Sequence, residues 1–445
     1  MRSALELPAF RRLALSYTLN ELCDWMGIVA LAVLVYDRTS SALATAGLFV
    51  AGKFLPSLLV PALTVRAERL PVARSLAGLY ALEAAVFTAL ALVAGDPWIP
   101  VVCVLAFVDG TIAATGRAIT RAATVAVLEP ASLLRQGNAA LNLGFSAMSI
   151  AGPALAGFLV GAAGVPTLIA ATAAVFALLA VLVGAARDLP RGAADETPWL
   201  QRLKAGADYA MHHPIVGPLI LAEAVLVVLF TMAPPIEIVY AKESLDGTDA
   251  TYGTLLTSWG AGVIIGSVVF TRAQARSLLM VMAASTLAIG LAYLGMAAAP
   301  TLGWAVPAAI LGGCGNGMQV VAVITSLQEA VREDMQARVA GFFEALLTAT
   351  PGVGFILGGL LAQLFSPRVA FLTAGIGVVL IVLLGLPLWR LRRGMRDIVA
   401  VRADHPLALA ELPIADVGTM AIPEVVSAPS IPIRAQDEAW DSGAG

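Results

Sequence analysis

Residues 12–36 read RLALSYTLNELCDWMGIVALAVLVY, an apolar stretch whose only charged residues after Arg12 are Glu21 and Asp24. A helix of about 20 predominantly apolar residues crosses the ~30 Å hydrocarbon core of a bilayer, where lipid offers backbone groups no hydrogen-bond partners. Stretches of this kind recur along the chain, and we expect twelve of them to span a membrane. They lie at 12–36, 42–64, 72–95, 98–121, 137–160, 166–187, 215–240, 251–271, 278–299, 302–326, 338–364 and 368–391.

The composition of the chain also indicates a lipid environment. Of its 445 residues, 59% are hydrophobic and only 13% are charged, whereas soluble domains carry about a quarter charged residues. Cys23, Cys103 and Cys314 each lie in an apolar run, without the spacing of a metal site. The sequence contains no phosphate-binding G-x-x-x-x-G-K-[ST] motif and no basic patch for nucleic acid. We therefore predict an all-α integral membrane protein without a metal, a cofactor or a nucleic-acid partner.

Positive charges in the predicted loops determine the orientation of the spans. Cytoplasmic loops of membrane proteins carry an excess of Lys and Arg. If both termini are cytoplasmic, most loop charges fall on the cytoplasmic side, and only Arg38, Lys242 and Arg368 fall on the other. Arg outnumbers Lys 24 to 3, which is typical of a GC-rich bacterial source. We expect a multi-pass protein of a bacterial plasma (inner) membrane, with both termini cytoplasmic.

The spans divide into two halves that resemble each other. Residues 188–214 form the longest polar connection, and they are expected to contain an amphipathic helix on the inner membrane face. Six spans precede this segment (residues 1–187) and six follow it (residues 215–395); the acidic tail at 396–445 is expected to be disordered. GPALAG at 152–157 has a counterpart about 202 residues later. Two parallel six-helix pseudo-repeats place a substrate site between the bundles near the midplane.

Four charged residues are predicted near the middle of the first four spans: Asp24, Lys53, Glu83 and Asp109. Each costs on the order of 2.5–3.5 kcal/mol at the centre of a membrane helix, so such residues must pair, become hydrated or change protonation state. One interpretation is that Lys53 pairs with Glu83 and holds two helices together. The surplus of carboxylates favours a second, functional interpretation, in which Asp24 is the principal proton-exchanging and substrate-competing group.

Further residues are assigned to the predicted cavity. Glu21, one helical turn from Asp24, or Asp109 is expected to assist in proton coupling. Arg117 is either a cavity charge or an anchor at the cytoplasmic end of its helix. In the second half, Asn316 and Gln319 are candidate hydrogen-bonding partners of the substrate.

Two apolar features of the second half are also predicted. Pro234-Pro235 removes backbone donors and should break the seventh span near its outer end. Four aromatic residues are candidates for an apolar pocket: Phe230, Trp259, Phe342 and Phe343.

Several motifs resemble those of a known family. NELCDW at 20–25 is similar to a first-helix Gly-Asp-Trp pattern, and Gly152, Pro153 and Gly157 of GPALAG are similar to the antiporter motif of a fifth helix. On these motifs, residues 10–395 resemble the major facilitator superfamily. Within it, they resemble twelve-helix bacterial exporters of the enterobactin-exporter and macrolide-efflux branch.

The chain departs from the family in the loop after the second span. The superfamily pattern there is G-x-L-A-D-R-x-G-R-R, whereas residues 61–69 read PALTVRAER, with Val65 in place of the Asp that latches the cytoplasmic gate. Arg66, Glu68 and Arg69 are the remaining gate-loop candidates. Either Glu68 substitutes for the Asp, or the conformational balance of this protein differs.

The resemblance and the charges within the spans together predict proton-coupled export. The expected substrate is a small amphipathic organic molecule, such as a drug, an antibiotic or a siderophore, moved by alternating access with the proton gradient as energy source. We expect a monomer in contact with the lipid bilayer, and no enzyme activity, because no catalytic constellation is present. Two alternatives stay open: a proton-coupled uptake permease, and a non-transporting membrane sensor or assembly partner.

Overall fold

The computed structural model describes residues 2–67, 71–186, 189, 199–272, 277–332 and 335–391. Eleven of its helices are long and apolar enough to cross a membrane, or twelve if one sharply bent pair is a single span. The expected all-α membrane class is therefore confirmed. The acidic tail, most of residues 188–198 and the gate-loop residues Glu68 and Arg69 lie outside the described residues.

The elements follow the chain in two series. The first comprises α1 (Arg2–Leu5), α2 (Pro8–Thr39), α3 (Ala42–Phe49), η1 (Val50–Phe54), α4 (Leu55–Ala67), α5 (Val72–Val93), α6 (Ile99–Leu128), η2 (Glu129–Ala131), α7 (Leu134–Ala163) and α8 (Val165–Gly184). The second comprises α9 (Trp199–His212), α10 (Val216–Phe230), α11 (Glu237–Val239), η3 (Tyr240–Ser244), α12 (Asp249–Arg272), α13 (Leu278–Ala298), α14 (Leu302–Ala330), α15 (Gln336–Ala349), α16 (Pro351–Leu364) and α17 (Pro367–Leu391).

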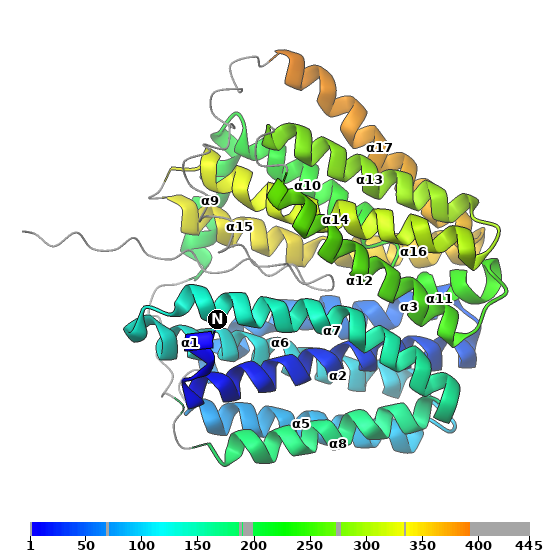
Figure 1. Cartoon of the computed structure of the whole chain (residues 1–445). Helices are drawn as coiled ribbons and strands as arrows, with labels where there is room; N and C mark the ends of the chain where they lie inside the picture. The colour runs from blue at the N-terminus through cyan, green and yellow to red at the C-terminus, as the bar shows by residue number, and fades with distance from the viewer. Residues whose placement is uncertain are drawn as a thin grey trace, which may run out of the picture.

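The two series form two groups of helices that face each other. Figure 1 shows α2 and α5 to α8 in one group and α10 and α12 to α17 in the other. We call the first group, together with α3, η1 and α4, the N-terminal bundle, and the second group, together with α11 and η3, the C-terminal bundle. Helices α7 and α12 lie in contact across the boundary, as do α3 and α16.

Small residues permit this close approach between the bundles. A Cβ atom added to Gly157 of α7 would lie 3.2 Å from the Cα atom of Gly253 of α12. A Cβ atom added to Gly359 of α16 would lie 2.3 Å from the Cβ atom of Ala46 of α3. Small residues let membrane helices pack backbone against backbone, where the hydrophobic effect supplies no driving force between helices. Both crossings therefore depend on glycine.

The first two spans are separated by a sharply defined corner. Pro8 occupies the first turn of α2, where its missing N–H costs nothing. The helix ends at Ser40, which adopts the left-handed conformation with φ 47°. Ser41 then caps α3, its side chain accepting a hydrogen bond from the Ala44 N–H at 3.2 Å. This corner places the end of α2 beside the start of α3.

The seventh predicted span is broken, as Pro234-Pro235 predicts. Helix α10 ends at Phe230, residues 231–236 form turns, and the chain continues as the short α11 and the π-helical η3. On its other side α10 meets α9 at a bend of 108°. Helix α9, within the predicted amphipathic segment, packs against α15, where Gly206 lies close to the backbone of Arg338.

Candidate functional site

A central pocket lies between the two bundles and contains about 1000 Å³ not filled by protein atoms, part of it open to solvent. Both halves of the chain line it, mostly with apolar and aromatic side chains. The N-terminal bundle contributes Glu21, Asp24, Trp25, Ile28, Phe49, Lys53, Arg117 and Ser149. The other half contributes Phe230, Thr231, Ala233, Pro234, Glu237, Tyr252, Leu256, Trp259, Gly260, Tyr293 and Phe355.

Asp24 of α2 and Arg117 of α6 form an ion pair on the wall of this pocket. An Arg117 Nη1–H group donates to Asp24 Oδ2, and the two side chains are only 12% and 7% exposed, in that order. Each charge compensates the other. Either charge alone at this buried position would be strongly unfavourable. Arg117 is thus a cavity charge, and its partner is Asp24.

Two more predicted residues reach the pocket. Glu21 lies one turn before Asp24 on α2, is 2% exposed and lines the pocket. Lys53 also lines it, from the π-helical segment η1. A π-helical turn is rare and often marks a functional position. The structure therefore brings four of the predicted residues together on one wall of the pocket: Asp24, Glu21, Lys53 and Arg117.

The remaining two charges of the first bundle lie outside the pocket lining. Glu83 is 0% exposed, and within the described residues neither of its carboxylate oxygens has a hydrogen-bond partner. The alternative in which Lys53 pairs with Glu83 is wrong for this structure, since no such ion pair forms among the described residues. Asp109 likewise has one buried carboxylate oxygen without a partner in the described part of the chain.

Asn316 and Gln319 are placed inside the C-terminal bundle instead of on the pocket wall. Gln319 Nε2 donates to Glu223 Oε2 at 3.1 Å, and Gln319 Oε1 accepts from Ser285 and Thr286 at 2.6 and 3.1 Å. Asn316 is 5% exposed and is not part of the lining. The prediction that these residues meet the substrate is not matched by this structure, because Gln319 is hydrogen-bonded to other helices of the bundle and Asn316 is not part of the lining.

The aromatic predictions are met in part. Phe230 and Trp259 line the pocket, with ring centroids 5.8 Å apart. Phe342 and Phe343 instead pack in a separate apolar cluster around α15. The sequence analysis missed Glu237, which lines the pocket just after the break in the seventh span. The available signal was an acidic residue two positions after Pro234-Pro235 in an apolar stretch.

Gly152, Pro153 and Gly157 form a contact strip of α7. A Cβ atom at Gly152 would lie 2.5 Å from Trp25 Cβ of α2, so only glycine fits there. The carbonyl oxygen of Pro153 and the Cα atom of Gly157 both lie against Gly253 of α12. The strip thus joins α2, α7 and α12 beside the pocket. Of the gate-loop candidates, Arg66 lies in α4 and the other two lie outside the described residues.

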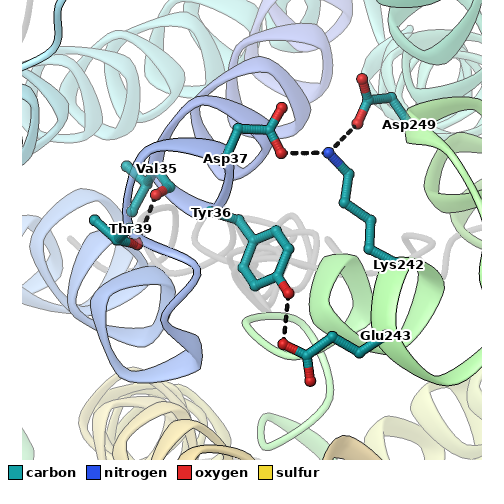
Figure 2. Close-up of polar contacts among 7 residues, drawn as sticks. All are labelled: Val35, Tyr36, Asp37, Thr39, Lys242, Glu243 and Asp249. Atoms are coloured by element: carbon teal, nitrogen blue, oxygen red, sulfur yellow. Dashed lines mark hydrogen bonds and ion pairs between the residues drawn. The ribbon is translucent and has the colours of Figure 1, made fainter.

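A polar cluster holds the bundles together at one end, where α2 ends and α3 begins. Lys242 of η3 forms ion pairs with Asp37 of α2 and with Asp249 of α12, the latter at 2.7 Å. The Tyr36 hydroxyl donates to Glu243 Oε1 at 2.5 Å. Figure 2 shows Lys242 between the two carboxylates, with Tyr36 directed to Glu243. We call these five residues the interbundle latch.

The electrostatics of the latch keep Lys242 charged. Its side chain is 19% exposed and lies outside the helices that span the membrane. Burial alone would lower the pKa of Lys242, but hydrogen bonds to Asp249 and Asp37 and the charges of these carboxylates outweigh it. The pKa of Lys242 is therefore raised above its ordinary value. The latch cation persists throughout the neutral range.

Comparisons with known proteins agree with this architecture. Residues 219–429 match the family model of the Major Facilitator Superfamily. The chain is 24% identical over 272 residues to the "Uncharacterized MFS-type transporter YfiS" of Bacillus subtilis (strain 168), an alignment that covers 58% of this chain and 64% of that protein. These findings support the major facilitator superfamily. The enterobactin-exporter and macrolide-efflux branch stays a prediction.

Solved structures share the fold at low sequence identity. The nucleoside transporter NupG has a TM-score of 0.70 and 13% identity, with 86% of this chain and 100% of that chain covered. A peptide transporter POT has a TM-score of 0.68 and 15% identity, with 86% and 94% covered. A bacterial homologue of the human lysosomal transporter Spinster, in an inward-facing and occupied conformation, has a TM-score of 0.68 and 13% identity, with 86% and 96% covered.

Proposed function

We propose that this chain, with the fold of Major Facilitator Superfamily transporters, is a secondary transporter that exports a small amphipathic organic molecule across a bacterial plasma membrane in exchange for protons. The family match and the YfiS relative support a membrane transporter of this type. The observation that carries the proton-coupling proposal is the Asp24–Arg117 ion pair on the wall of the central pocket.

Alternating access follows from the position of the pocket. Two parallel six-helix repeats carry a binding site at their interface, and rocking of one bundle against the other opens it to each side in turn. Here the interbundle latch closes one end of that interface. By the loop charges, that end faces away from the cytoplasm. The described conformation is then closed to the outside.

Proton exchange follows from the chemistry of the ion pair. An ionised Asp24 carboxylate compensates Arg117, whereas a proton on Asp24 removes that charge and releases the guanidinium. Proton binding and substrate binding then compete at the same wall of the pocket. Each proton that enters down the membrane potential supplies about 2.3 kcal/mol per 100 mV, and this free energy can drive substrate outwards.

The test is flux in everted membrane vesicles, with and without an imposed proton gradient. A toxicity screen that compares deletion with overexpression first supplies substrates. We expect accumulation of these substrates only with the gradient, and its loss in Asp24→Asn. Asp208→Asn is the matched control, because Asp208 of α9 is exposed and is not part of the pocket lining.

The outcomes separate the proposal from its alternatives. Gradient-driven loss of substrate from everted vesicles would indicate an uptake permease. Binding of a compound without gradient-dependent flux would indicate a sensor or assembly partner. Normal gradient-driven flux by a correctly inserted Asp24→Asn variant would remove Asp24 from the mechanism, while the transporter assignment would stand.

A further inference from the structure

The C-terminal wall of the pocket carries an acidic side chain that the proton-coupling mechanism does not use. Glu237 begins α11 directly after the break of the seventh span, and it is 8% exposed. It lines the pocket, yet its carboxylate makes no hydrogen bond or ion pair with the described residues. A buried carboxylate without a partner is unfavourable, so this position is suited to a ligand that supplies one.

Aromatic rings surround the same part of the pocket. Trp259 stacks on Tyr293 with centroids 5.7 Å apart, and Phe230 lies 5.8 Å from the Trp259 ring and 6.4 Å from Tyr293. All three side chains line the pocket together with Glu237. The electron-rich faces of aromatic rings attract cations, most strongly where water is excluded.

The rings are held in place before any ligand binds. The Tyr293 hydroxyl donates to the Phe230 carbonyl oxygen at 3.0 Å. Gly312 of α14 leaves room for the six-membered ring of Trp259, because a Cβ atom there would lie 2.3 Å from it. Such preorganisation lowers the cost of binding.

The other charges of the pocket leave Glu237 available. Arg117 is paired with Asp24. Lys53 lies in η1 of the opposite bundle, within electrostatic reach of Asp109. An anionic ligand would meet repulsion at Glu237, and a neutral ligand would leave its carboxylate without a counter-charge. A cation with an apolar body satisfies both the carboxylate and the rings.

We infer that this wall binds organic cations, such as hydrophobic amines or quaternary ammonium and phosphonium ions. Glu237 serves as counter-ion, and Phe230, Trp259 and Tyr293 supply the aromatic lining. As a statement about the transported substrate, the inference rests on the proposed function. The binding site itself can be tested without transport.

The test uses the purified full chain in detergent and two probes of the same shape and opposite charge, tetraphenylphosphonium and tetraphenylborate. Equilibrium dialysis should show that the wild type binds the phosphonium at least about tenfold more tightly than the borate. Glu237→Gln should lose about tenfold or more of the phosphonium affinity and none of the borate affinity. Trp259→Leu, a second variant, should also weaken phosphonium binding.

The matched control is Glu223→Gln, which removes another buried carboxylate of the same half that is not part of the lining. It should bind the phosphonium like the wild type. Equal binding of both probes by the wild type would overturn the inference, and this result does not require any variant to fold. An unchanged phosphonium affinity in a folded Glu237→Gln variant would also overturn it. If phosphonium binding depends on Glu237 but no flux is seen, the transport proposal is disproved and this binding site stands. If flux is driven by the gradient but binding does not depend on Glu237, this site is disproved and the transport proposal stands.

Discussion

Asp24 and Arg117 depend on each other at the scale of single residues. Both side chains are at least 88% buried, and the guanidinium of Arg117 and the carboxylate of Asp24 compensate each other's charge. Removing one partner of a buried ion pair leaves an uncompensated charge, which typically costs about 3–5 kcal/mol, whereas replacing both partners is often nearly neutral. A single substitution at this pair should therefore destabilise the protein much more than the double substitution does.

We predict that Arg117→Met lowers the thermal unfolding midpoint in detergent, by a change equivalent to about 3 kcal/mol or more. The double variant Asp24→Asn with Arg117→Met should recover most of that loss. Circular dichroism or a fluorescence melt of the purified variants checks both values. Equal midpoints for the single and the double variant would contradict the assigned pairing.

Gln319 supports a second prediction at this scale. Its side chain joins Glu223 to Ser285 and Thr286 in a fully buried network. Gln319→Leu should therefore destabilise the protein by about 1–3 kcal/mol, because it leaves buried polar groups without partners. Ser326→Ala on the same helix is the control, since it removes only a weak contact to the Met282 sulfur atom at 3.3 Å. Similar melting points for both variants would mean that the network contributes little.

At the scale of elements, three residues of this network occupy positions equivalent to those of three charged residues in the first bundle. Glu223, Ser285 and Gln319 lie 202 positions after Glu21, Glu83 and Arg117, at the offset that the GPALAG repeat indicates. At these three positions the second bundle also has one carboxylate, Glu223, but it has neutral residues where the first bundle has Glu83 and Arg117.

The sequence predicts the elements well and their faces less well. Apolar stretches must become helices in lipid, and Pro234-Pro235 must interrupt one of them, so spans and break are both predictable. Which face of α14 meets the pocket depends on the rotation of that helix within its bundle. For this reason the sequence alone predicts that Gln319 faces the cavity, whereas in the structure it lies inside the bundle. Glu237 was missed because its role depends on the turn that follows the break.

The glycine crossings give an element-scale prediction. Gly359→Ala places a Cβ atom 2.3 Å from Ala46 Cβ, so α16 and α3 can no longer approach as they do here. We expect a shift away from the described conformation, seen as faster labelling of a cysteine introduced into the pocket lining by a thiol reagent added from the latch side. Gly161→Ala is the control, because nothing lies within 4 Å of the added atom. Equal accessibility in both variants would show that this crossing does not restrict the conformation.

At the scale of the whole molecule, the interbundle latch is a contact that no single segment predicts. Asp37 and Lys242 are far apart in sequence, and only the docking of the two bundles brings them together. The loop charges nevertheless place Arg38, Lys242 and Arg368 on one side of the membrane. In the structure Arg368 also lies at this end, donating to the Ser244 and Ala297 carbonyl oxygens.

The latch should bias the equilibrium between the two access states. Partly exposed ion pairs are each worth roughly 0.2–1 kcal/mol, and of the two pairs made by Lys242 the one with Asp37 crosses between the bundles. Lys242→Met should therefore raise the population open at this end by a factor of about 1.4 to 5. Spin labels at the exposed positions Ala163 and Thr301, with the native cysteines replaced, should report a larger share of long distances in pulsed electron resonance. Arg38→Met is the matched control, because its 2.6 Å ion pair with Asp96 stays within the N-terminal half.

The pH dependence of the same measurement has a definite sign. The pKa of Lys242 is raised in the folded chain, so its contribution to the closed state is complete below the pKa of a free lysine and is lost only as the pH rises through the raised value. The wild-type distance distribution should therefore not open between neutral pH and about pH 9, where lysine remains charged. If it opens in this range, Lys242 is not the charge that holds the bundles together. An Arg38→Met variant that opens as far as Lys242→Met would likewise assign the effect to general surface charge, because the ion pair of Arg38 with Asp96 lies within the N-terminal half.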